Sequence, residues 1–251
     1  FCVFTFSILA ESEWSEPIEL SSTTENCAAY PSMAVDSKGN IHCVWTNSAN
    51  GYVTMYYSYS KDQGVTWSTP YDVTKINTEH HVIYAPEIVI DSNDDVYVLY
   101  AYIISYLKDD YESALYLQKY NGTAWDNPIN VSAEQPGAGI YPNTQIVIDN
   151  YDRVYMFWYN YDYNSNGFRT FYRYYENRML SDIQSTCDMD ISTADIAVDE
   201  NNDFHCVGRR IYKYPIFYSY DYSENIWSDI TQIESDYYGD GDAGHGVKIC
   251  L

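Results

Sequence analysis

Apolar and polar positions follow one repeated pattern along the chain. A short apolar segment ends in an aspartate, a polar turn follows, and a second apolar segment begins. This pattern recurs at intervals of about 50 to 58 residues, with its aspartate at Asp36, Asp91, Asp149 and Asp199. The turns contain Asn, Asp, Ser and Gly, which favour tight connections between antiparallel strands. The pattern therefore predicts a β-hairpin in each copy of a repeat.

Two further strands are expected in each repeat. After the hairpin comes a segment of alternating aromatic residues, as in residues 55–60 (MYYSYS), and then a segment that usually begins at a tryptophan, as at Trp67, Trp125 and Trp227. Four strands in a repeat of this length predict an all-β chain folded as a β-propeller, with one four-stranded antiparallel blade per repeat.

The repeats predict one domain over residues 1–251. The expected blades are residues 31–73, 86–131, 142–184 and 193–233, with a partial blade made by residues 1–21 together with 247–251. A ring of five blades follows if both ends of the sequence belong to one blade. The alternative is a fragment of a six- or seven-bladed ring, or an open stack of blades in a longer protein.

Composition supports the all-β class and narrows the partners. The chain has 30 Tyr, 6 Trp and 8 Phe, and aromatic residues favour strands. Its formal net charge of −23 repels phosphate backbones and anionic lipid head groups. No apolar run reaches the roughly 20 residues that span a bilayer. We expect neither a nucleic-acid partner nor membrane insertion; the charge also keeps a tyrosine-rich surface soluble. The oligomeric state stays open.

The cysteines and two glycosylation sequons indicate where the protein is located and whether it binds zinc. The six cysteines include no CxxC pair, which argues against a zinc site. Cys43 and Cys206 occupy the same position of the repeat and are expected to be small buried apolar residues. The sequons at Asn121 and Asn130 fit a secreted or cell-surface protein. Residues 1–10 have the apolar character of a signal peptide without its basic flank, and an ordered strand is the preferred interpretation.

One turn carries a motif that is specific to a family. Residues 60–67 (SKDQGVTW) match every specified position of S-x-D-x-G-x-T-W, and this octet resembles the Asp-box of the bacterial neuraminidase repeat (BNR). The resemblance implies a sialidase-like β-propeller with the box at the blade periphery. Asp62 is expected to accept hydrogen bonds from its own turn, Gly64 to adopt a positive φ, and Trp67 to pack between blades.

Sialidase activity is nevertheless not expected. The family that the Asp-box resembles uses three arginines for the substrate carboxylate, a Tyr–Glu nucleophile pair and usually an Arg-Ile-Pro motif. This chain has no Arg-Ile-Pro, and its arginines all lie in two adjacent repeats. A triad that converges from separate blades cannot be built from them. We assign no catalytic residue, and the repeated turn aspartates are expected to be structural because they share one position.

Aromatic residues gather on the loops expected at one face of the ring. A tyrosine precedes the first strand in three repeats, at Tyr30, Tyr84 and Tyr141. Equivalent positions converge at the channel mouth, so these rings form either a sugar-binding platform or blade-to-blade contacts. The loops between second and third strands add candidate ligand-binding residues, namely Tyr102, Tyr159, Asn160, Arg209 and Arg210.

One acidic loop suggests a calcium site, and calcium is the only cofactor that the sequence suggests. Asp236, Asp240 and Asp242 stand among glycines, and carboxylate oxygens are the ligands that calcium prefers. The loop lacks EF-hand spacing, and a solvated acidic loop is the competing interpretation.

Three functions remain in competition. The first is a non-catalytic recognition module that binds a glycan or a partner protein through the tyrosine-rich face. The second is a glycoside hydrolase or polysaccharide lyase, which requires a deep central pocket with two carboxylates at catalytic separation. The third is a structural component of a surface or filament.

Overall fold

The computed structural model describes residues 16–21, 28–49, 51–75, 81–105, 111–133, 144–162, 167–186, 191–210, 215–233 and 249. These residues form strands, turns and irregular chain without any helix, which confirms the all-β prediction. Across the same ranges there is accordingly no helix with the length and apolar character of a membrane span.

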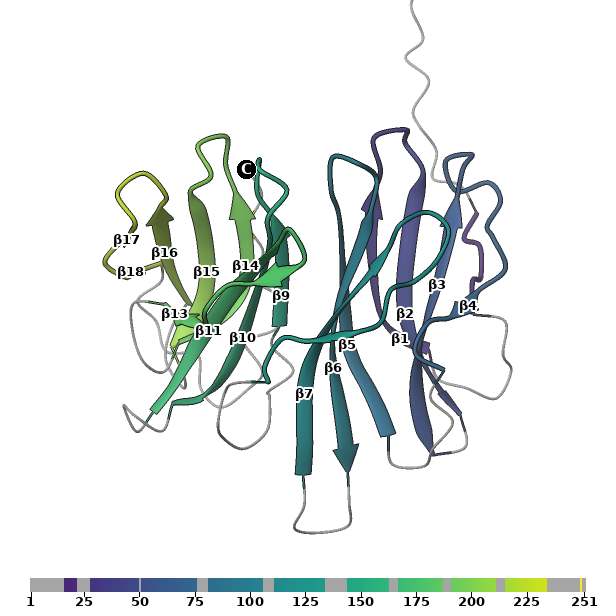
Figure 1. Cartoon of the computed structure of the whole chain (residues 1–251), viewed down its shortest axis with the longest axis horizontal. Coiled ribbons are helices and arrows are strands. Elements are labelled where there is room, and N and C mark those ends of the chain that lie inside the picture. The colour runs from purple at the N-terminus through teal and green to yellow at the C-terminus, as the bar shows by residue number, and fades with distance from the viewer. Residues whose placement is uncertain are drawn as a thin grey trace, which may run out of the picture.

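The strands form one eight-stranded sheet and two five-stranded sheets (Figure 1). A single parallel pair divides the eight-stranded sheet into two repeats, and the four resulting units are here called blades 1 to 4. Blade 1 contains β1 (Ala28–Val35), β2 (Ile41–Ala49), β3 (Tyr52–Ser60) and β4 (Tyr71–Asp72). Blade 2 contains β5 (His81–Ile90), β6 (Val96–Ser105), β7 (Tyr111–Tyr120) and β8 (Ile129–Asn130). Blade 3 contains β9 (Thr144–Ile148), β10 (Val154–Asp162), β11 (Gly167–Glu176), β12 (Met179–Leu180) and β13 (Gln184–Ser185). Blade 4 contains β14 (Ile191–Val198), β15 (Phe204–Arg210), β16 (Pro215–Asp221), β17 (Ile226–Trp227) and β18 (Thr231–Gln232).

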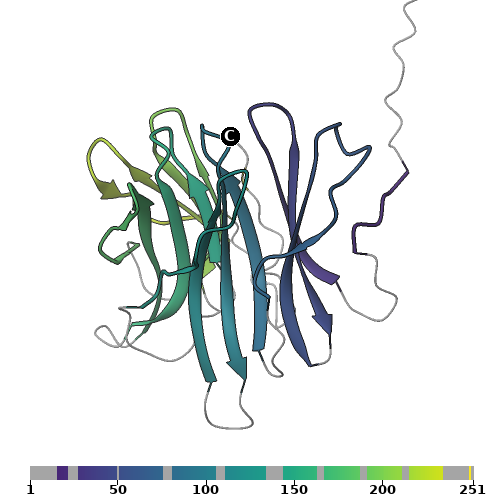
Figure 2. The same cartoon turned by 45° about the vertical axis from the view of Figure 1, so that its right-hand side comes forward.

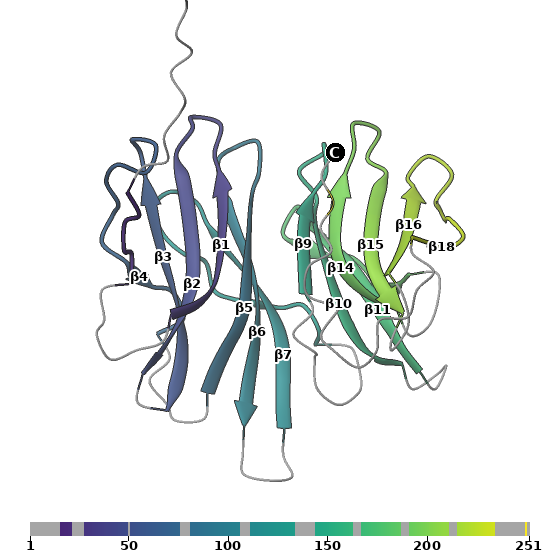
Figure 3. The same ribbon diagram turned by 180° about the vertical axis from the view of Figure 1, so that it is seen from behind.

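The blades are arranged so that their first strands meet. Within each blade, the first three strands pair antiparallel in chain order. The first strands β1, β5, β9 and β14 lie next to one another in the interior, and the later strands lie farther out (Figures 2 and 3). One parallel pairing, Val53 with Val82, links β3 to β5. No sheet closes on itself among the described strands.

The core consists of three apolar layers, each between two consecutive blades. The layer between blades 2 and 3 contains Leu99, Leu115 and Leu117 from blade 2 and Met156 and Trp158 from blade 3, each at most 1% exposed. Equivalent layers lie between blades 1 and 2 and between blades 3 and 4. Blades 2 and 3 therefore bury both faces of their middle strands by stacking, which explains the nearly continuous apolar sequences of those strands.

The two repeat-matched cysteines belong to these strands. Cys43 is 4% exposed and Cys206 is fully buried, and neither is part of a disulfide. Burial raises the pKa of the Cys43 thiol to about 11, which disfavours the reactive thiolate. The expectation of buried apolar cysteines is confirmed.

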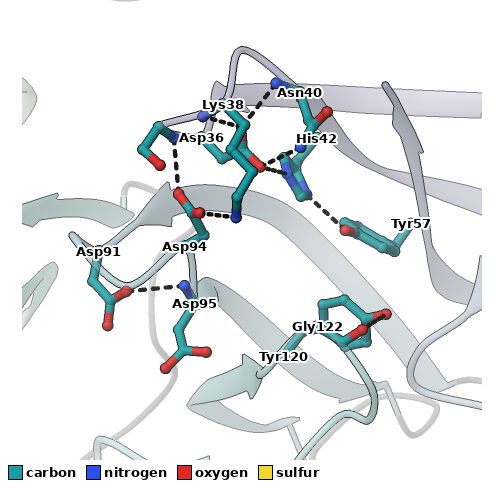
Figure 4. A network of polar contacts seen from close by, with 11 residues as sticks. Asp36, Lys38, Asn40, His42, Tyr57, Asp91, Asp94, Asp95, Tyr120 and Gly122 are labelled. Atoms are coloured by element: carbon teal, nitrogen blue, oxygen red, sulfur yellow. Dashed lines mark hydrogen bonds and ion pairs between the residues drawn. The ribbon is translucent and has the colours of Figure 1, made fainter. Parts of the chain in front are cut away.

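The hairpin turn between first and second strands is built in the same way in all four blades. In blade 1, Asp36 Oδ1 accepts hydrogen bonds from the backbone N–H groups of Lys38 at 2.9 Å and Asn40 at 2.8 Å (Figure 4). Burial alone would raise the pKa of Asp36, but the hydrogen bonds, above all those from Asn40, outweigh it and lower the pKa. The same pair of backbone bonds recurs at Asp91, Asp149 and Asp199. These aspartates therefore shape turns, as their repeated position predicts.

A second set of bonds, here called the turn clasps, joins each turn to the next blade. A backbone N–H of one turn donates to a side-chain oxygen in the following turn: Ser37 to Asp94 at 2.8 Å, Ser92 to Asp152 at 2.9 Å, and Asn150 to Asn202 at 2.8 Å. The three acceptor residues have φ of 64°, 62° and 68°, a conformation that Asp and Asn tolerate better than most residues. Blade 1 has Gly39 at this position, with φ of 80°, so its turn offers no acceptor side chain.

The octet at residues 60–67 closes the turn that follows β3. Asp62 accepts from the backbone N–H of Thr66 at 2.8 Å and from its hydroxyl at 2.6 Å. Gly64 has φ of 89° and donates its N–H to Ser60 Oγ at 2.8 Å. The Trp67 indole donates to the Gly64 carbonyl at 3.1 Å. The expected roles of Asp62 and Gly64 are thus confirmed, whereas the expected packing of Trp67 between blades stays a prediction.

Candidate functional site

A central pocket lies where the first strands of all four blades converge. Its volume is about 350 Å³, and its lining includes Tyr30 and Ser32 from β1, Glu87 from β5, Gln145 from β9 and Asp195 from β14. The lining also includes Pro31 and Pro86, which follow residues of positive φ at Tyr30 (52°) and Ala85 (43°). These are bulge positions, where the strand pairing shifts register, and a bulge redirects the side chains beside it.

Tyr30 and Tyr84 meet at the border of this pocket. Their ring centroids are 4.5 Å apart with planes inclined by 45°, and the Tyr30 hydroxyl donates to that of Tyr84 at 2.6 Å. Tyr30 remains 44% exposed. The two rings thus form a contact between blades 1 and 2, whereas their role as a sugar-binding platform stays a prediction. Tyr141 lies outside the described residues.

Polar residues of the first strands form a ladder from blade to blade, here called the central ladder. Ser32 Oγ accepts from the N–H of Ile88 at 3.3 Å. Glu87 accepts from the N–H of Ile146 at 3.0 Å and from the Gln145 amide at 2.8 Å. In these two rungs, from β1 to β5 and from β5 to β9, a side chain of one first strand accepts the backbone N–H of the next.

The ladder continues beyond blade 4. Asp195 Oδ2 accepts from the N–H of Ile249 at 2.9 Å. Glu87 and Asp195 are the acidic residues that line the pocket, and both use carboxylate oxygens to hold neighbouring backbone. The pocket therefore contains two carboxylates, but each has a structural partner in place.

The remaining candidate residues lie within strands, not in the expected loops. Tyr102 lies in β6, and its hydroxyl is hydrogen-bonded to His81 Nδ1. Tyr159 and Asn160 lie in β10 and are only 6% and 3% exposed. The predicted strand end was wrong here, because β10 continues as a polar and aromatic strand to Asp162, paired with β11.

Arg209 and Arg210 show the same extension in blade 4. Their backbones end β15 and pair with Ser192 and Ile191 of β14, whereas their side chains lie outside the described part of the structure. The loop placement of these arginines was therefore also wrong at the backbone level. A ligand-binding role for them stays a prediction, as it does for Tyr102, Tyr159 and Asn160.

Sequence reasoning missed the residues of the central ladder. Ser32, Glu87, Gln145 and Asp195 each stand four positions before the turn aspartate. A signal was present, because each is a polar residue within an otherwise apolar strand segment, and buried polar groups normally have a structural or binding partner.

A second cavity lies toward the outside, between blades 1 and 2. Its volume is about 430 Å³, and its lining includes Tyr57, Tyr59, Tyr71, Tyr120 and Trp125. Tyr57 is fixed in place by a 2.7 Å bond between its hydroxyl and His42 Nδ1 and by an edge contact with Trp125. Tyr71 is 44% exposed. This outer pocket is aromatic but lacks an acidic side chain in its lining.

The proposed calcium loop cannot be placed. Asp236, Asp240 and Asp242 lie outside the described residues. Within the described ranges, no group of three or more His, Cys, Asp or Glu side chains is arranged to hold a metal ion.

Comparison of the sequence with family models and with curated proteins gives no match. The fold, however, is similar to several solved structures. A protein of unknown function from Dyadobacter fermentans aligns over 84% of this chain and 70% of its own, with 13% identity and a TM-score of 0.65. The NanB sialidase of Streptococcus pneumoniae aligns over 86% and 53%, with 11% identity and a TM-score of 0.64. The polysaccharide lyase Uly1 aligns over 86% and 52%, with 8% identity and a TM-score of 0.59.

These similarities define the fold. The chain has a sialidase-like β-propeller architecture, and it spans about half the length of the sialidase and lyase chains it matches.

Proposed function

We propose that this sialidase-like propeller binds carbohydrate at the mouth of its central pocket and does so without catalysis. The observation that carries the proposal is the Tyr30–Tyr84 pair at the border of a pocket of about 350 Å³. A partly exposed aromatic ring beside polar groups suits the apolar face and hydroxyls of a sugar. Several fold neighbours act on carbohydrates by their names, which supports the substrate class at the level of the fold.

The engagement of the pocket carboxylates favours binding over catalysis. A general acid or nucleophile needs a carboxyl group free to reach the substrate. Glu87 instead accepts two hydrogen bonds from blade 3, and Asp195 accepts one from Ile249. Breaking these bonds during a reaction would open the contacts between blades.

A glycoside hydrolase or polysaccharide lyase is the second candidate. The specific observation in its favour is that Glu87 and Asp195 line one central pocket, together with the enzymatic fold neighbours. The third function considered, a structural component of a surface or filament, would require association through the ring faces.

The finer features of the protein belong to the same proposal. We infer that the turn at residues 60–67 is an Asp-box, that the complete ring has five blades, and that the protein works outside the cell or at its surface. The bond between Asp195 and Ile249 supports a further blade after blade 4, and the net charge of −23 fits a neutral glycan as ligand and disfavours an anionic polymer.

The test is glycan binding by a tyrosine variant. We expect the wild-type chain to bind members of a glycan array, and Tyr30→Ala/Tyr84→Ala to lose at least about tenfold in affinity through lost ring contacts, since 1.4 kcal/mol is tenfold. Tyr71→Ala is the matched control, because Tyr71 is also 44% exposed but lines the outer pocket. Calorimetry with the best glycan measures both affinities.

Two results would contradict the proposal. Equal affinity of the wild type and the double variant would show that the glycan does not bind at the central pocket. A loss of affinity in Tyr71→Ala alone would show that it binds at the outer pocket. Release of shorter sugars from the bound glycan, abolished in Glu87→Gln, would establish the enzyme instead.

A further inference from the structure

The outer pocket between blades 1 and 2 presents aromatic rings to solvent. Tyr71 is 44% exposed, and three further lining rings, those of Tyr59, Tyr120 and Trp125, are partly exposed. Every residue that lines this pocket of about 430 Å³ belongs to the described part of the chain. The pocket therefore offers a ligand several ring faces that come from two blades.

Several hydroxyl groups of this pocket already have hydrogen-bond partners within the chain. They belong to Tyr57, Ser68, Tyr120 and Thr123. The Tyr57 hydroxyl is 2.7 Å from His42 Nδ1, and the Tyr120 hydroxyl donates to the Gly122 carbonyl at 2.9 Å (Figure 4). A sugar is oriented by hydrogen bonds in addition to ring contacts. This lining therefore suits a ligand that is recognised mainly by ring faces.

Cations of the chain itself already lie over two rings of the pocket. The Lys61 ammonium is 5.2 Å from the centroid of the Tyr59 ring, and the Lys75 ammonium is 5.6 Å from that of Tyr71. Both lysines are exposed. Because the face of an aromatic ring is electronegative, it attracts a cation. The rings of the outer pocket thus have the electrostatic character of a cation site.

The ring arrangement of this pocket recurs between blades 3 and 4. There Tyr172 and Trp227 make an edge contact with ring centroids 5.7 Å apart. Tyr57 and Trp125 make the same kind of contact at 5.2 Å between blades 1 and 2. The contacts between these two pairs of blades can therefore be compared residue by residue.

Between blades 3 and 4, a cation of the protein lies among the rings. The Arg153 guanidinium is 5.6 Å from the ring centroid of Tyr174 and 4.8 Å from that of Tyr222. Its Nε donates to Asp149 at 2.7 Å, which anchors the guanidinium. In blade 1 the uncharged Asn40 stands at the position of Arg153, four residues after the turn aspartate. The contact between blades 1 and 2 therefore lacks this built-in guanidinium.

We propose that the outer pocket binds a small organic cation of the quaternary ammonium class, a molecule with a trimethylammonium group. The methyl groups of such a cation spread its charge over an apolar surface, which ring faces stabilise without any hydrogen bond. The net charge of −23 raises the concentration of cations near the protein. The ligand competes with the Lys61 ammonium for the Tyr59 ring. This site is separate from the central pocket and does not depend on the proposed glycan site.

Calorimetry with choline and with its neutral isostere 3,3-dimethyl-1-butanol tests the proposal in the unmodified protein. The two probes have the same shape and the same hydroxyl group but differ in charge. After subtraction of a sodium chloride titration, we expect choline chloride to bind at least about tenfold more tightly than the isostere. Equal affinities would overturn the proposal, because the pocket would then recognise apolar shape alone. Absence of choline binding would overturn it as well.

Two variants of Tyr71 locate the site. Tyr71→Leu removes a ring face but keeps an apolar side chain, whereas Tyr71→Phe keeps the face. We expect the affinity for choline to fall at least about fivefold in the leucine variant and to stay within about twofold of the wild type in the phenylalanine variant. Because Tyr71 is 44% exposed, both variants should keep the thermal midpoint of the wild type. Unchanged affinity in Tyr71→Leu would overturn the assigned pocket.

Lys61→Met tests the competition with the resident ammonium. Loss of this cation from the Tyr59 ring should raise the affinity for choline severalfold. Arg178→Met is the matched control, because it removes the same charge from an exposed residue in blade 3. An equal rise in both variants would assign the effect to overall charge and would overturn the role of the Tyr59 ring.

Discussion

Single polar side chains at the turns hold neighbouring blades together. Asp94 is the clearest case, because it has a positive φ of 64° and receives two donors from blade 1, the Ser37 N–H at 2.8 Å and the Lys38 ammonium at 2.5 Å. The hydrogen bond from Lys38, followed by that from Ser37, lowers the pKa of Asp94 to about 2. The folded state therefore favours the ionised carboxylate more strongly than the unfolded chain does.

The stability that Asp94 contributes should depend on pH in the acid range. Because its folded pKa is depressed, the contribution is complete above the unfolded value of about 3.9 and is lost as the pH falls toward 2. We expect Asp94→Ala to have a lower thermal midpoint at pH 6 and a shallower decline in stability between pH 4 and pH 2 than the wild type. Thermal unfolding followed by circular dichroism measures both.

Asp94→Asn is the matched control for this turn. Blade 4 has Asn202 at the same position with φ of 68°, where its side-chain oxygen accepts the Asn150 N–H. The asparagine variant should keep the turn conformation and the bond from the Ser37 N–H, but its contribution to stability should no longer depend on pH in the acid range. Equal destabilisation by Ala and Asn at pH 6 would show that charge, not the clasp, is the important factor.

At the scale of the strand, the first strand β5 combines two functions. Its apolar positions pack between blades, and the polar residue after its bulge bonds to the next first strand. In β5, Glu87 performs the second function toward β9. A β-bulge makes this arrangement available, because it turns one side chain out of the regular alternation.

Removal of the Glu87 acceptor should destabilise the contact between blades 2 and 3. Glu87→Ala leaves the Ile146 N–H without this acceptor, which costs about 1–3 kcal/mol for a donor shielded from water. Glu87→Gln keeps an oxygen acceptor, so its free energy of unfolding should fall by less than half as much as that of Glu87→Ala. Urea unfolding monitored by tryptophan fluorescence, which includes buried Trp158 of that layer, gives both free energies; equal losses would contradict the acceptor role.

At the scale of the whole molecule, charge opposes compactness. A net charge of −23 at pH 7 produces self-repulsion that the fold must overcome. We expect the thermal midpoint at pH 7 to rise with sodium chloride up to about 0.5 M, because salt screens this repulsion. Near pH 4.2, the isoelectric point, the same salt series should leave the midpoint nearly unchanged. An equal rise at both values would attribute the effect to apolar burial instead.

Local chemistry explains which parts of the fold the sequence alone could predict. The hairpins follow from turn residues within a few positions of Asp36, Asp91, Asp149 and Asp199, and the turn at residues 60–67 depends on contacts within eight residues. The strand ends around Tyr159 and Arg209 were missed because alternating polar and aromatic residues also suit an exposed loop. In the structure, pairing with a neighbouring strand makes these residues part of strands β10 and β15.

The site was harder to predict, since its contacts join distant residues. Tyr30 and Tyr84 are 54 positions apart, and Glu87 and Ile146 are 59 apart. The repeat placed the two tyrosines on one face, but only the stacking of blades shows that they touch each other. The ladder acids were overlooked because their partners are backbone groups, which carry no signal in the sequence.

The turn clasps and the apolar layers give the joints between described blades two contributions with different responses to temperature. Apolar attraction weakens on cooling, whereas the polar clasps do not share that dependence. The clasps therefore carry a growing share of the cohesion between blades as the temperature falls.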